Sequence, residues 1–131
     1  MMKHYHAAIW IDHASARVFS LTADKADEWT IRPHERHAHI HLKAGVTGAG
    51  KAVTEIAFFE GIADALQGAG AILIAGPASA KTQFATWLRK KHPGLGDKIV
   101  AVEPLDHPSD GQFIAFARKF FRAEDRMTPG T

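Results

Sequence analysis

The hydrophobic pattern of this chain changes period once, near Gly45, and that change restricts the fold more than any other feature. Before it, three short runs at 7–12, 17–22 and 27–31 carry the apolar spacing of β-strands, with turns of a few residues between them. Links this short predict an antiparallel meander. Residues 37–42 alternate weakly, so they either extend the third strand or form an edge ribbon.

After Gly45 the chain alternates between helical periodicity and short apolar strands. Ser109 with Gln112 three residues later fits a capping box that opens the last helix. Strands linked through helices need crossovers, which favours parallel pairing. The sequence therefore predicts an α/β fold, a ribonuclease-H-like mixed sheet of about five strands (β-β-β-α-β-α-β-α) with helices on both faces. The expected later elements are a helix at 53–66, a strand at 71–75, a helix at 84–91, a strand at 99–102 and a helix at 109–121.

Length and composition limit the classes of function. The 131 residues suit a single domain, 1–131, with a flexible tail from about 124 to 131. The absence of cysteine excludes disulfides, iron–sulfur sites and thiol nucleophiles. Basic and acidic residues are mixed, with a formal net charge of +2, so no nucleic-acid-binding tail is visible. The longest apolar run near the N-terminus is too short for a membrane span or a signal peptide, so we expect a cytoplasmic protein without a membrane partner.

The glycine-rich segment 45–52 comes close to a phosphate-binding P-loop. However, Ala52 occupies the position where serine or threonine would hold magnesium, and the preceding 37–42 segment is polar instead of a buried strand. A loop followed by a helix start is therefore the favoured interpretation. Metal-dependent nuclease chemistry is also disfavoured, because the strand at 71–75 ends in Gly76 without a carboxylate. The acidic residues that such a nuclease would use are Asp12, Glu55 or Glu60, and Asp110. Asp12 is more typical of a turn-former.

Three histidines alternate in the segment that follows the third predicted strand. In an extended strand, His37, His39 and His41 lie on one face, with successive Cα atoms about 6.6 Å apart. Such an arrangement can bind zinc or nickel. An exposed polar face on an edge ribbon is favoured, because no carboxylate or cysteine completes the set, and metal binding by zinc is the alternative. A further alternative is a homo-oligomer that pairs through the 37–42 edge.

Four blocks of the sequence, spread over residues 7–121, form a recognisable set. The most specific is the strand-loop-Lys-Thr-helix block Ile72-Leu73-Ile74-Ala75-Gly76-Pro77-Ala78-Ser79-Ala80-Lys81-Thr82. The other three are the opening hairpin from Ala8 to Phe19, the glycine-rich loop from His41 to Gly50, and the final helix entry His107–Phe113. Together these blocks resemble the middle domain of class-1 peptide-chain release factors of eukaryotes and archaea, and of Pelota ribosome-rescue proteins. The chain also resembles small bacterial stand-alone proteins described as translational machinery proteins.

The sequence departs from the family at its hydrolytic motif. Release factors carry Gly-Gly-Gln in the glycine-rich loop, whereas this chain has Gly48-Ala49-Gly50. The resemblance therefore implies a shared fold and contact with the ribosome or tRNA, without peptidyl-tRNA hydrolysis. On this basis we predict a non-catalytic translation-associated binding protein. The expected RNA-contacting residues are Lys43, Gly48, Ala49, Gly50, Lys51 and Lys81.

Overall fold

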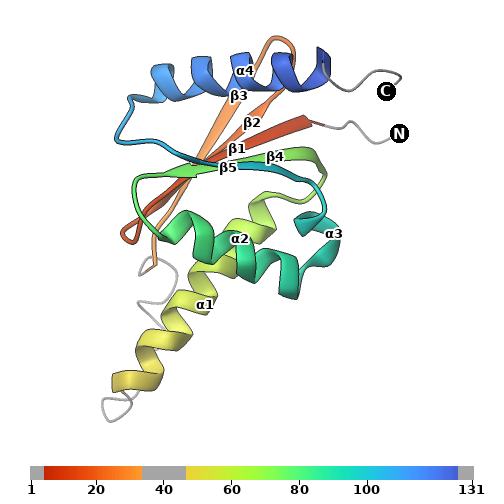
Figure 1. The fold of residues 1–131 in the computed structure, drawn as a ribbon. Coiled ribbons are helices and arrows are strands. Elements are labelled where there is room, and N and C mark those ends of the chain that lie inside the picture. Colours follow the sequence, from red (N-terminus) through yellow and green to blue (C-terminus); the bar gives the residue numbers. More distant parts are fainter. Residues whose placement is uncertain (1–4, 34–46, 127–131) are drawn as a thin grey trace.

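The computed structural model describes residues 5–33 and 47–126. In chain order the elements are β1 (Tyr5–Ile11), β2 (Ala16–Leu21), β3 (Ala26–Ile31), α1 (Thr47–Ala65), β4 (Ala69–Gly76), α2 (Ala80–Lys91), α3 (Pro93–Gly96), β5 (Ile99–Pro104) and α4 (Asp110–Arg126). Figure 1 shows three layers, with α4 on one face of the sheet and α1 and α2 on the other. Among the described residues, no helix is long and apolar enough to cross a membrane.

The five described strands form one mixed sheet in the order β3-β2-β1-β4-β5. β1 pairs antiparallel with β2 and β2 pairs antiparallel with β3, which is the predicted meander. β4 pairs parallel with both β1 and β5. The central strands β1 and β4 are apolar on both faces because helices cover both sides of the sheet, whereas the edge strand β3 is mostly exposed. The predicted fold class is confirmed.

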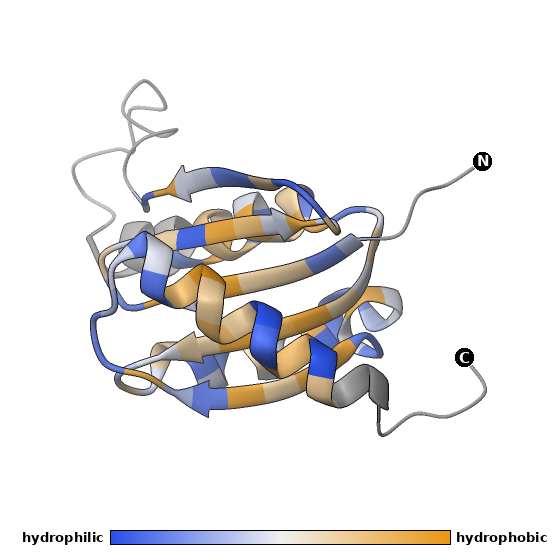
Figure 2. Ribbon diagram, turned by 90° about the horizontal axis from the view of Figure 1, so that it is seen from above, coloured by the Kyte–Doolittle hydropathy of each residue, from blue (hydrophilic) through white to orange (hydrophobic). Residues whose placement is uncertain are grey.

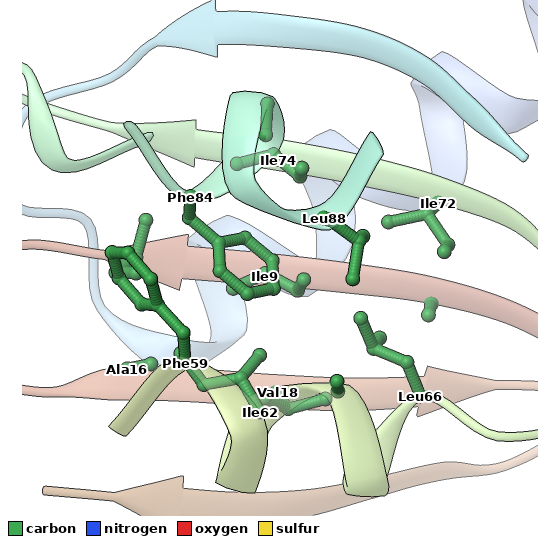
Figure 3. Packing of buried hydrophobic residues seen from close by; sticks show 14 of the residues in the cluster. Ile9, Ala16, Val18, Phe59, Ile62, Leu66, Ile72, Ile74, Phe84 and Leu88 are labelled. Atoms are coloured by element: carbon green, nitrogen blue, oxygen red, sulfur yellow. The ribbon is translucent and has the colours of Figure 1, made fainter. Parts of the chain in front are cut away.

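Alternate residues of β1 enter two separate cores, one on each face of the sheet. Ile9 and Ile11 lie in the core under α1 and α2, where Phe59 and Phe84 pack edge to face with ring centroids 5.3 Å apart (Figure 3). Ala8 and Trp10 enter the core under α4. Figure 2 shows α4 lying across that face, and its buried residues recur every four positions, at Phe113, Ala117 and Phe121.

The start of α4 forms the predicted capping box. The Ser109 hydroxyl accepts a hydrogen bond from the Gln112 backbone N–H at 3.1 Å, and the Gln112 side chain accepts one from the Ser109 N–H at 2.9 Å. Two predicted boundaries are wrong. The helix expected from residue 53 begins at Thr47, and α4 continues to Arg126, so the residues 124–126 assigned to a tail are helical. The short helix α3 was not predicted.

Candidate nucleic-acid interface

The residues predicted to contact RNA fall in three places. Lys43 lies outside the described residues. Residues 48–51 lie in the first turns of α1, so the segment 47–50 is helical and not a loop as expected. Figure 1 shows these turns extending away from the sheet. Lys81 lies in the first turn of α2, where its ammonium group donates a hydrogen bond to the Ala78 carbonyl.

The predicted metal ligands His37, His39 and His41 also lie outside the described residues. Within residues 5–33 and 47–126, no group of three histidine, aspartate or glutamate side chains is placed to hold a metal ion. Three of the acidic residues considered for nuclease chemistry have other partners: Glu60 contacts His92, Asp110 pairs with Arg17, and Asp12 holds a turn. Asp12 accepts hydrogen bonds from the N–H groups of Ala14 and Ser15 at 2.8 and 2.9 Å, which confirms its role as a turn-former.

Polar groups at the carboxyl ends of β1 and β5 hold the connection between β5 and α4. The Trp10 indole N–H donates to the Asp106 carbonyl at 2.7 Å and to the Leu105 carbonyl at 3.3 Å. The Arg17 guanidinium lies 4.8 Å from the centre of the Trp10 ring and pairs with Asp110. These groups therefore fix the 104–109 connection and the start of α4.

A carboxyl pair borders this cluster on β3. Partial burial raises the pKa of Glu28, and the neighbouring Asp110 carboxylate raises it further by repulsion and by accepting a hydrogen bond from the protonated form. The Arg17 guanidinium opposes this shift. Arg17 is thus the cation that pairs with Asp110 and faces Glu28.

A basic groove lies at the opposite end of the sheet, where β1 begins. It has a volume of about 1280 Å³ and is lined by the start of β1, the β2–β3 turn, the starts of β3 and β4, Lys98 before β5 and the second half of α4. Four cationic side chains and one histidine line it against two carboxylates. These residues are Lys25, Lys98, Arg118, Arg122 and His6, against Asp24 and Asp27.

Arg118 fixes the shape of this groove. Its guanidinium donates to the Thr22 carbonyl at 2.7 Å and to the Lys25 carbonyl at 2.9 Å, so it ties the β2–β3 turn to α4. Figure 1 shows that turn next to α4. The His6 ring stacks on Phe121, with centroids 4.2 Å apart and the planes 10° from parallel. The groove therefore combines one guanidinium held by hydrogen bonds, that of Arg118, with three further cations and the His6 ring stacked on the buried Phe121.

Sequence reasoning missed this groove because its residues come from five separate segments of the chain. The one local signal is the spacing of Arg118 and Arg122, which lie four residues apart and so share a face of a helix. That signal shows two neighbouring cations. It does not show that Lys25 and Lys98 lie at the same end of the sheet.

The fold of this chain is similar to that of one part of archaeal Pelota proteins. Similarity to Pelota from Archaeoglobus fulgidus has a TM-score of 0.60 at 17% sequence identity, over 88% of this chain and 31% of the Pelota chain. For Pelota from Thermoplasma acidophilum the TM-score is 0.59 at 18% identity, over 89% of this chain and 33% of the other. This chain thus spans about a third of the length of those proteins. Neither a protein-family model nor a curated protein matches the sequence.

Proposed function

We propose that this protein is a non-catalytic, translation-associated binding module that contacts the ribosome or tRNA. The observation that carries the proposal is the similarity of nearly nine-tenths of the chain to a part of Pelota, found independently of the sequence blocks that resemble release-factor middle domains. Fold similarity alone does not assign an activity, so the residues of the chain must also suit this role.

Those residues favour binding over catalysis. Gly50 stands where release factors place the glutamine of Gly-Gly-Gln, and glycine has no side chain to position a water molecule for attack on an ester. At the carboxyl edge of the sheet, Asp12 stabilises a turn and Asp110 pairs with Arg17 at the start of α4. The predicted contact residues Lys43, Gly48, Ala49, Gly50, Lys51 and Lys81 supply backbone amides and ammonium groups suited to phosphates.

Co-sedimentation with purified ribosomes at low and high salt tests this proposal. We expect the protein to pellet with ribosomes at about 50 mM salt and to dissociate at several hundred millimolar, since phosphate contacts release counterions. The Lys43→Ala/Lys51→Ala variant should pellet less. The matched control is Lys90→Ala/Lys91→Ala, which removes the same charge from the last turn of α2. Wild-type protein that stays in the supernatant at every salt concentration would contradict the proposal.

A second candidate function is metal binding by His37, His39 and His41. The alternate spacing of these residues in the sequence supports it, because three imidazoles on one face of an extended segment match a zinc ligand set. Calorimetric titration with zinc at pH 7.5 should then give saturable binding that disappears near pH 5.5, where imidazoles are protonated. If the variant with alanine at all three positions binds zinc as tightly as the parent, this function is excluded.

A further inference from the structure

We propose that the basic groove at the start of β1 binds a segment of single-stranded RNA through its phosphates. This would be a second contact surface, separate from the first turns of α1, and it deepens the proposed function by naming the partner's chemistry. The groove residues that carry the inference are Lys25, Lys98, Arg118, Arg122 and His6.

The cations of the groove are available for a ligand. Lys25 and Arg122 are exposed and Lys98 is half-buried, and none of the three side chains has a hydrogen-bond or ion-pair partner among the residues that the structure describes. A lysine or arginine on a protein surface is ordinarily isolated and solvated. Here three unpaired cations from three separate elements converge on one concave surface. Convergence of this kind concentrates positive potential and attracts a polyanion.

The wall of the groove is fixed before any ligand binds. Arg118 holds the carbonyls of Thr22 and Lys25 with two hydrogen bonds, so the turn that carries the Lys25 side chain is tied to the helix that carries Arg122. A ligand would therefore meet cations whose backbone positions are already set. This lowers the entropy that binding must lose.

The size and chemistry of the groove favour a polymer over a small ligand. Its volume of about 1280 Å³ exceeds the range of roughly 300–1,000 Å³ typical of small-molecule pockets. The cations come from a turn, from the residue before β5 and from a helix, so they can contact successive phosphates of one strand. The half-buried His6 ring stacks on Phe121, which is buried, so of this pair only His6 offers a surface on which an unpaired base can stack. Asp24 and Asp27 also line the groove, and their charge opposes binding of an acidic peptide as much as it opposes RNA.

Fluorescence anisotropy with a labelled 12-nucleotide oligouridine RNA, at salt concentrations from 50 to 200 mM, tests the inference. The full chain should bind, and Lys25→Ala/Lys98→Ala/Arg122→Ala should lose about tenfold or more in affinity. Because each phosphate contact on a single strand contributes about 0.7 to the slope of log affinity against log salt, the slope should fall by about 2. The control Arg89→Ala/Lys90→Ala/Lys91→Ala removes the same charge from the last turn of α2 and should change affinity less than about twofold. If the triple variant does not keep the parent's circular dichroism spectrum, the double variant Lys25→Ala/Arg122→Ala, which changes only exposed residues, replaces it in the affinity measurement.

Three results would overturn the inference: no binding by the parent protein, equal losses in the groove and control variants, or displacement of the RNA by an equal charge concentration of polyglutamate. The outcome is separable from that of the ribosome experiment. A groove that binds no RNA in a protein that still pellets with ribosomes would remove only the second surface. A parent protein that never pellets with ribosomes would remove the proposed function, whatever the oligonucleotide shows.

Discussion

Replacing Gly76 with alanine is expected to lower the free energy of unfolding sharply, because at this glycine the end of β4 lies against the backbone of β1. A Cβ atom built at Gly76 would lie 2.2 Å from the carbonyl oxygen of Ile11. Ordinary close contacts between carbon and a carbonyl oxygen are about 3.3 Å, so the two strands would have to separate by roughly 1 Å. Neither group can rotate away, since the obstacle is backbone in a central strand.

Overpacking of a well-packed interior costs typically about 1–3 kcal/mol, and a clash between backbone atoms belongs at the upper end, about 2–3 kcal/mol. For a domain of this length, each kcal/mol lowers the melting temperature by about 4 °C. Gly76→Ala should therefore melt about 8–12 °C below the parent protein in a thermal scan followed by circular dichroism.

Gly111→Ala provides the matched control, because no atom lies within 4 Å of a Cβ at that position in α4. Alanine is the better helix former, so this variant should equal the parent or exceed it by up to about 1 kcal/mol. The close-contact reasoning fails if Gly76→Ala melts within about 2 °C of the parent, or if the two variants lose stability equally.

Three further predictions concern polar contacts. Ser109→Ala removes the cap of α4 and should lower the free energy of unfolding by about 1 kcal/mol in a urea titration. Trp10→Phe keeps an aromatic ring but removes the N–H donor to the Asp106 carbonyl. This variant should lower the free energy of unfolding by about 1 kcal/mol and increase amide hydrogen exchange across the 104–109 connection. Unchanged exchange would show that this hydrogen bond does not fix the connection. Because the folded pKa of Glu28 is raised above its ordinary value, the stability this group contributes is present at acid pH and is lost as pH rises through the raised pKa. Glu28→Gln should therefore melt higher than the parent at pH 7 and lose that advantage below pH 4; a lower melting temperature at pH 7 would show that the attraction to Arg17 outweighs the repulsion from Asp110.

Local chemistry made much of the fold predictable. The apolar run of β4 has no polar face, which required burial on both sides and hence a central parallel strand, and the structure has this arrangement. The capping box was readable because Ser109 and Gln112 lie three residues apart and interact with each other. Where an element depends on residues close together in the sequence, the pattern of residue types was sufficient to predict it.

Boundaries and long-range contacts were less predictable. Glycines cost a helix about 1 kcal/mol each relative to alanine, so Gly48 and Gly50 indicated a loop. Once the later turns of α1 pack on the sheet, the helix is already nucleated, and extending it toward the N-terminus is easier than starting a new helix. The helix therefore begins at Thr47. The bond from Trp10 to Asp106 joins residues 96 positions apart, and no periodicity predicts it. The basic groove was missed for the same reason.

The central position of β1 has a consequence for how the chain folds as it is synthesised. The meander of β1, β2 and β3 closes through short turns and can pair as soon as these strands leave the ribosome. The other edge of β1 must wait for β4, which begins at Ala69, so until then an apolar strand edge is open to pairing with other chains. Closing the long loop between β1 and β4 costs entropy, and the contacts between these strands offset that cost only after β4 has been synthesised. Substitutions where β1 pairs with β4 should therefore slow folding and promote aggregation of nascent chains. This effect should exceed that of substitutions within the meander that lower the free energy of unfolding by the same amount.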